Sequence, residues 1–194
     1  MSIYHRSRIG LKRAYTLIEM LIVVALLGIA GALLIPHLVH QDNLTAQAAV
    51  RLLIADLSFA QSDSLANQEY RRVQFLQDAG GNGYGYCIVR MTEADFDLPF
   101  DLATADFISD PLGVVGEPGR YIVDFRTENR FDGVSIIISN FDGANQYITY
   151  DTLGGTIMTG NLPGTGGQIQ LQVQDVIYQI DVSPFTGKLT VTKL

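Results

Sequence analysis

The sequence predicts an α+β protein in which one long N-terminal helix packs its second half against antiparallel β-sheets. Three observations support this fold class. Residues 20–35 form an apolar run without a charged side chain. Residues 44–67 then carry apolar side chains at helical spacing, which is typical of a helix with one buried face. After residue 67, short β-branched and aromatic runs alternate with glycine-containing and proline-containing turn signals, a pattern that indicates antiparallel strands.

Residues 1–14 form a basic leader in front of the apolar run. The leader contains four basic residues and no acidic residue, and the segment just beyond the run is not basic. The four basic residues are Arg6, Arg8, Lys12 and Arg13. Because positive charge stays on the cytoplasmic side of a membrane, we expect a cytoplasmic N-terminus and a C-terminal domain in the periplasm or outside the cell.

Residues 15–38 are expected to form a transmembrane helix in the inner membrane. The apolar run from Met20 to Ile35 gives roughly 24 Å of helix at about 1.5 Å per residue, which nearly spans a bilayer core. A secretory signal peptide is disfavoured, because the run ends in Ile35 and Pro36 instead of small residues before a cleavage site. A plain single-pass anchor is an alternative, but it leaves Glu19 unexplained, since an acid at the mouth of a membrane span is costly without a partner.

Residues 39–68 are expected to continue the same helix as an amphipathic segment. Small and apolar side chains recur there at alternating spacings of four and three, with polar residues between them. The recurring positions are Ala46, Val50, Leu53, Leu57, Ala60 and Ser64. This stripe predicts the face that packs on the folded domain.

Residues 69–194 are expected to form a β-rich globular domain. Strands are predicted over residues 71–76, 84–90, 121–125, 134–139, 146–150, 169–173, 176–182 and 189–192. An insert over residues 92–119 holds seven acidic residues and no basic one, and its interleaved phenylalanines indicate partial packing. Between a calcium site and a solvated loop in this insert we favour the loop, because no EF-hand spacing is present.

The segment Arg13-Ala14-Tyr15-Thr16-Leu17-Ile18-Glu19 resembles the prepilin processing site of type IV pilins and type II secretion pseudopilins. In that family a basic leader ends in glycine and is followed by an aromatic residue, Thr-Leu-Ile-Glu and an apolar helix. Counted from Tyr15 as the first residue, Glu19 is fifth, Gly28 fourteenth and Pro36 twenty-second, which are places where the family commonly has these residues. Ala14 stands where the family prefers glycine.

The resemblance implies a role for each of these positions. A prepilin peptidase and N-methyltransferase would cut between Ala14 and Tyr15 and methylate the new amine of Tyr15. Glu19 would be an assembly residue that pairs with the Tyr15 amine of a neighbouring subunit, since an unpaired charge in a helix bundle is costly. Gly28 and Pro36 would break or locally melt the helix. For Pro36 the alternative is that it simply marks the exit from the membrane.

Later parts of the chain are similar to minor pseudopilins and minor pilins of the GspH/FimT type. The similar parts are the helix end over residues 57–66, the strand Arg72-Val-Gln-Phe75 and the ending Val182-Ser-Pro-Phe-Thr-Gly187. This resemblance implies a long helix with two antiparallel sheets on its C-terminal half. It does not cover the insert over residues 92–119.

Residue types needed for catalysis are missing from the predicted domain. The three histidines, His5, His37 and His40, lie in the leader or at the membrane exit, so no catalytic triad or metal-ligand spacing can be assembled. We therefore expect no enzyme, no cofactor and no metal. Cys87 is the single cysteine, so no intramolecular disulfide can form, and its apolar surroundings predict a buried thiol.

These features favour a structural subunit of a type II secretion pseudopilus or type IV pilus-like filament. Its expected partners are other pilin or pseudopilin subunits, the prepilin peptidase and the inner-membrane assembly platform. The chain carries a net charge of -7, and without the leader 9 basic and 20 acidic residues give -11. A DNA-binding minor pilin is a disfavoured alternative, because only Lys188 and Lys193 follow Arg130. A membrane-anchored binding domain that never enters a filament is the other alternative.

Overall fold

A computed structural model describes residues 15–110 and 119–194, and within these ranges all side chains except those of residues 33–42 and 138. The leader over residues 1–14, including Ala14, therefore lies outside the described residues. The chain divides into two compact units, Met1–His40 and Gln41–Leu194, and each is described by itself.

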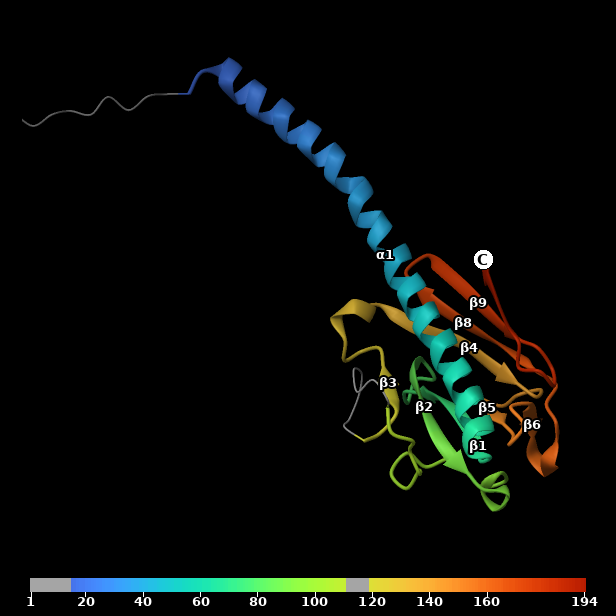
Figure 1. Cartoon of the computed structure of the whole chain (residues 1–194). Helices are drawn as coiled ribbons and strands as arrows, with labels where there is room; N and C mark the ends of the chain where they lie inside the picture. The colour runs from blue at the N-terminus through green and yellow to red at the C-terminus, as the bar shows by residue number, and fades with distance from the viewer. Residues whose placement is uncertain (1–14, 111–118) are drawn as a thin grey trace, which may run out of the picture. The chain divides into compact units, whose positions relative to one another are not determined.

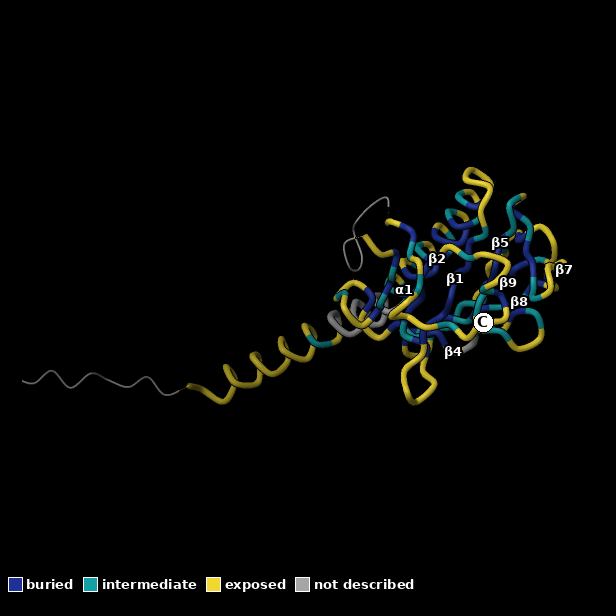
Figure 2. Tube along the Cα trace, turned by 90° about the horizontal axis from the view of Figure 1, so that it is seen from below, coloured by how far each residue is buried: buried dark blue, intermediate teal, exposed yellow. Residues whose placement is uncertain are grey.

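Helix α1 spans Leu17–Asn67, which confirms one long helix (Figure 1). The stripe expected on its second half is buried, since Ala46, Leu53, Leu57 and the other three positions are each at most 5% exposed. In Figure 2, buried residues of this half of α1 are dark blue, and exposed residues are yellow. The helix ends where Gln68 adopts a left-handed φ of 56° and the Glu69 N–H donates to the Ser64 carbonyl at 3.2 Å, as in a Schellman motif.

The strands form one antiparallel sheet in the described residues. Its strands are β1 (Tyr70–Gln77), β2 (Gly83–Met91), β3 (Ile122–Asp124), β4 (Val134–Phe141), β5 (Tyr147–Tyr150), β6 (Thr156–Met158), β7 (Leu162–Pro163), β8 (Gly167–Val173), β9 (Val176–Val182) and β10 (Leu189–Lys193). Their order is β10-β9-β8-β4-β2-β1-β5-β6-β7, with β3 paired to β2. Short 3-10 helices lie at Glu93–Asp95, Asn129–Phe131 and Thr159–Asn161. All eight predicted strands are confirmed, whereas β6 and β7 were not predicted.

The GspH/FimT resemblance implied two antiparallel sheets. This prediction is wrong, because the described strands form a single curled sheet. Its two halves meet where β2 pairs with β4 through Gly83 and Ile136. A Cβ atom on Gly83 would lie 2.4 Å from the Ile136 carbonyl oxygen, so the strands approach this closely only because the residue is glycine. Farther along this edge of β2, residues 85–87 pair with β3 and Val89 forms a bridge with Phe107.

A buried polar cluster ties α1 to the sheet. The Asp56 carboxylate of α1 is 5% exposed and accepts hydrogen bonds from the hydroxyls of Tyr86, on β2, and Tyr121, the latter at 2.9 Å. Burial raises the pKa of Asp56, and the two hydroxyls partly offset this effect. This cluster fixes the position of the helix on the sheet, because a shift along the helix axis would leave a buried carboxylate without partners.

The part of the acidic insert that the structure describes is partly packed, as its phenylalanines predicted. Phe96 and Ile108 are buried, and Phe107 forms a β-bridge with Val89 of β2. Residues 111–118 of the insert lie outside the described residues. Within the described parts of the chain, no group of three or more histidine, cysteine, aspartate or glutamate side chains is placed to hold a metal ion.

The predicted burial of Cys87 is confirmed. Its side chain is fully buried on β2, and burial raises the pKa of the thiol to about 12. Because the thiolate is the reactive form, we expect the native protein to resist a thiol reagent such as iodoacetamide at pH 8 and to be modified after unfolding in urea. Mass spectrometry of the intact chain measures the modified fraction. Rapid modification without denaturant would contradict the buried position.

Candidate processing and assembly site at the start of the long helix

The residues predicted for processing lie where the described chain enters α1. Tyr15 is 73% exposed, and Thr16 follows it directly before the first helical residue, Leu17. The peptide bond expected to be cut joins Tyr15 to Ala14, which is outside the described residues. A protease that needs an accessible, non-helical chain would therefore find Tyr15 outside the helix.

Thr16 and Glu19 form a capping box at the start of α1. The Glu19 N–H donates to the Thr16 hydroxyl oxygen at 3.3 Å, and the Thr16 N–H donates to Oε2 of Glu19 at 3.4 Å. The first turn is closed by Glu19 and Met20, whose N–H groups donate to the Thr16 carbonyl at 3.1 and 3.2 Å. A threonine followed three residues later by glutamate is the sequence signature of this motif, although the motif was not among the predictions made above.

The capping box gives Glu19 a structural role within a single chain. The capping box satisfies N–H groups at the helix start. The negative charge of Glu19 is also favourable near the positive end of the helix dipole. The expectation that a plain membrane anchor leaves Glu19 unexplained is therefore wrong. Among the residues that the structure describes, the Thr16 N–H donates to Oε2 of Glu19.

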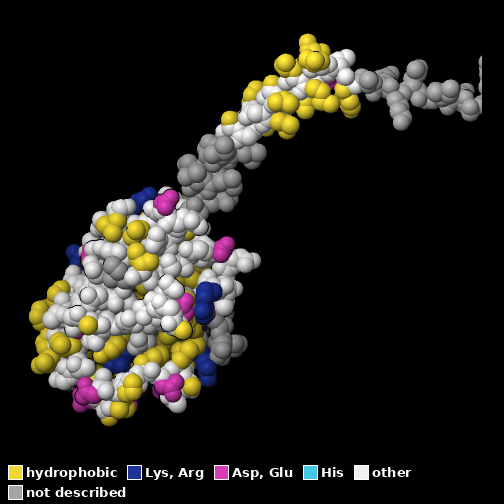
Figure 3. All heavy atoms as spheres, turned by 180° about the vertical axis from the view of Figure 1, so that it is seen from behind, with side chains coloured by type: hydrophobic (Ala, Val, Ile, Leu, Met, Phe, Trp, Pro, Cys, Tyr) yellow, Lys and Arg dark blue, Asp and Glu magenta, His cyan; other side chains and the backbone are white. Residues whose placement is uncertain are grey.

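Apolar side chains cover the first turns of α1 in the unit Met1–His40. Leu17, Ile18, Val24, Leu27 and Ile29 are each more than 60% exposed. Figure 3 shows the hydrophobic side chains gathered along this part of the helix. Surface of this kind in a single chain marks a contact with lipid or with another protein.

Gly28 and Pro36 both lie inside α1, which runs through them as one element. Among the residues that the structure describes, no atom lies within 4 Å of the position where a side chain on Gly28 would begin, so none of them requires glycine there. The side chain of Pro36 is among those not described. A helix break at these two residues stays a prediction.

The membrane span expected over residues 15–38 is not confirmed. Among the residues that the structure describes, no helix has the length and apolar character needed to cross a bilayer.

Comparison with known proteins finds one shared feature, at the N-terminus. Residues 11–35 match the family model described as the prokaryotic N-terminal methylation motif, a type IV pilin-like signal. The match confirms a type IV pilin-like signal at the N-terminus, whereas the cut between Ala14 and Tyr15 and the assembly role of Glu19 stay predictions. Neither a curated protein nor a solved structure matches the chain.

Proposed function

We propose that this chain is a filament subunit, a minor pseudopilin or minor pilin of the GspH/FimT type, in a type II secretion pseudopilus or a type IV pilus-like filament. The observation that carries the proposal is that the match to the methylation motif, over residues 11–35, coincides with a capped helix start at Thr16 and Glu19. The subunit acts by assembly and has no catalytic role.

Maturation begins with a cut between Ala14 and Tyr15 by a prepilin peptidase, and the new amine of Tyr15 is methylated. The cut removes the four basic residues of the leader, the charges that hold the N-terminus on the cytoplasmic side of the membrane. The apolar surface of the first turns of α1 then moves from lipid into contact with the same surface of other subunits.

Assembly uses the Glu19 carboxylate. Before assembly its Oε2 accepts from the N–H of Thr16, the residue next to the new amine. In the filament the carboxylate accepts from the methylated Tyr15 amine of a neighbouring subunit. A subunit that is offset along the filament axis would bury both charges unpaired in a medium of low dielectric constant, so this pair selects one axial register.

The charges of the domain support a structural role over DNA binding. Four arginines, Arg71, Arg90, Arg126 and Arg130, are each paired with a carboxylate of the same chain. Binding to a phosphate backbone needs cations that are free to replace counterions. Since the chain without the leader carries a net charge of -11, its surface repels nucleic acid.

The proposal is tested by the N-terminal sequence and mass of the protein recovered from membranes, with and without a prepilin peptidase. We expect a chain that begins with N-methylated Tyr15 when the peptidase is present and an intact leader when it is absent. The variant Ala14→Gly restores the residue that the family prefers, so we expect it to be cut faster.

Retention of residues 1–14 with the peptidase present, in both the natural chain and Ala14→Gly, would overturn the proposal. A membrane-anchored binding domain that never enters a filament would then be the favoured function. Cleavage of Ala14→Gly but not of the natural chain would show that this chain is not matured, and would equally argue against a filament role.

A further inference from the structure

Two adjacent arginines on β1 are buried to the same extent but differ in their partners. Arg71 and Arg72 are each 2% exposed, and they point to opposite faces of the sheet because side chains alternate along a strand. Arg71 is paired with the carboxylates of Asp63 and Glu69. Among the residues that the structure describes, no carboxylate lies within 4.0 Å of Arg72, so this buried cation has no ion-pair partner.

Arg72 is held in place by neutral groups. Its Nε–H donates to the Thr149 hydroxyl at 3.2 Å, and Nη2 donates to the Phe96 carbonyl at 3.5 Å. The guanidinium carbon lies 3.9 Å from the centre of the Tyr147 ring. A guanidinium has five N–H donors, so these contacts leave three unused. Burial lowers the pKa of Arg72, and the charge of the nearby Asp95 carboxylate opposes this effect.

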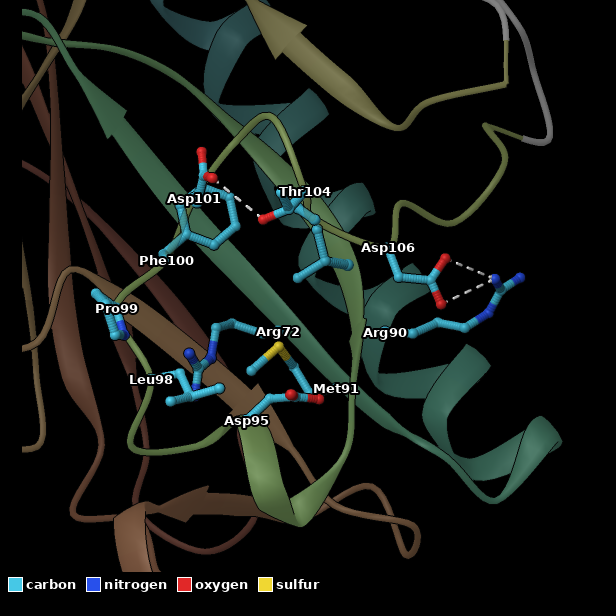
Figure 4. A pocket seen from close by; sticks show the side chains of 12 residues that line it. Arg72, Arg90, Met91, Asp95, Leu98, Pro99, Phe100, Asp101, Thr104 and Asp106 are labelled. Atoms are coloured by element: carbon cyan, nitrogen blue, oxygen red, sulfur yellow. Dashed lines mark hydrogen bonds and ion pairs between the residues drawn. The ribbon is translucent and has the colours of Figure 1, made fainter.

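A pocket of about 320 Å³ reaches Arg72 from the side of the acidic insert (Figure 4). Its walls include apolar side chains of β2 and of the insert: Val89, Met91, Leu98, Pro99, Phe100 and Ala105. Figure 4 shows the side chain of Arg72 next to Leu98, Met91 and Asp95. The other half of the lining is polar, and Arg72 is the buried charged group among these side chains. Apolar walls combined with a buried charged group are a feature of small ligand sites.

The acidic side chains that line the pocket already have partners within the chain. Asp95 accepts from the Thr92 hydroxyl at 2.6 Å, Asp106 from Arg90 at 3.2 Å, and Asp101 from the Thr104 hydroxyl at 3.2 Å. These three carboxylates around the pocket repel an anion in proportion to its charge. A singly charged anion is therefore favoured over phosphate, and a polyanion such as DNA is excluded.

We infer that this pocket binds a carboxylate carried on a compact apolar group, with Arg72 as its anchor. The buried guanidinium of Arg72 supplies a positive charge and N–H donors to the carboxylate of the ligand. The apolar walls of the pocket cover the apolar group of the ligand. The carboxylate belongs to a free organic acid or to an acidic side chain or C-terminus of a partner protein. The inference does not depend on the filament role, because every residue that carries it lies in the domain.

The test follows binding by NMR on the full chain in detergent, with methionine methyl groups labelled with ¹³C. Met91 lines the pocket and reports occupancy, whereas Met158 does not line it and serves as an internal control. The probes are isovalerate for a free acid, N-acetyl-leucine for a protein C-terminus, N-acetylglutamate α-amide for an acidic side chain, and inorganic phosphate. We expect a saturable shift of Met91 with at least one carboxylate, with a dissociation constant on the order of 1 mM.

Two variants separate anchoring by Arg72 from a merely structural role. Arg72→Gln removes the charge, and we expect it to weaken carboxylate binding at least about tenfold. Leu98→Trp, at a position that is 59% exposed, should block the pocket without disturbing the core, so it keeps the test decisive if Arg72→Gln fails to fold. Arg126→Gln is the matched control, because Arg126 also stacks on a tyrosine, Tyr84, but is paired with Asp124. It should bind like the natural chain.

The probe that binds most tightly identifies the source of the carboxylate. A Met91 signal that none of the carboxylates shifts would overturn the inference. So would phosphate binding as tightly as the carboxylates, or unchanged binding in Leu98→Trp.

Discussion

Replacing Glu19 with glutamine is expected to reduce incorporation into a filament about 100-fold or more, while helix α1 keeps its start. Glutamine at this position still accepts a hydrogen bond from the Thr16 N–H, so the capping box survives. The substitution removes the negative charge that pairs with the Tyr15 amine of the next subunit. An ammonium buried without its partner costs about 3–5 kcal/mol, and each 1.4 kcal/mol is tenfold in an equilibrium.

The control for this prediction is Thr16→Val, which removes the cap and keeps the charge. Loss of the Thr16 hydroxyl costs the helix about 1 kcal/mol, so the helix start frays, but the Glu19 carboxylate stays available to a neighbour. We expect Thr16→Val to be incorporated close to the natural level. The measurement is the amount of each variant in sheared filaments relative to the membrane fraction, with processing checked by N-terminal sequence.

Either of two results would contradict the assembly role of Glu19. If Glu19→Gln enters filaments as well as the natural chain, the charge pair is not needed for assembly. If Thr16→Val fails as completely as Glu19→Gln, the helix cap is the requirement, and the capping box within one chain explains the glutamate.

The long helix could be predicted because its evidence is local. The spacing of Ala46, Leu53 and Leu57 repeats with the period of a helix, and each of these positions is buried in the structure. The strands that carry β-branched and aromatic runs were equally readable, since each run lies within a few residues. The short strands β6 and β7 were not found, because three residues and two residues carry too little pattern.

The sheet topology and the pocket could not be predicted because they depend on contacts far apart in the sequence. The junction of the two halves of the sheet is one close approach between Gly83 and Ile136, and the glycine there reads locally as part of a turn. In the sequence, Arg72 cannot be distinguished from other polar residues of a strand. Its burial depends on Thr149, Tyr147 and the insert, which contact it only in the folded chain. The capping box, in contrast, was visible in the sequence and was missed because Glu19 had been interpreted through assembly alone.

Replacing Arg71 with methionine is expected to lower the free energy of unfolding by about 3 kcal/mol. The Arg71 guanidinium joins three segments, since its Nε pairs with Asp63 of α1 and its Nη1 pairs with Glu69, between α1 and β1, at 2.9 Å. Nη1 also donates to the Tyr70 carbonyl at 3.1 Å. Breaking a buried pair from one side costs about 3–5 kcal/mol. The lower end applies because Glu69 is 52% exposed and can be hydrated again once Arg71 is gone.

The measurement is thermal unfolding followed by near-ultraviolet circular dichroism, where we expect the midpoint to fall by about 6–12 °C. The matched control is Arg130→Met. Arg130 is 50% exposed and pairs with Glu128, so its loss should cost at most about 1 kcal/mol. Equal shifts in the two variants would mean that the buried cluster around Arg71 does not hold the end of α1 to the sheet. In that case the stability of the helix end would come from its apolar stripe, because that stripe is unchanged in both variants.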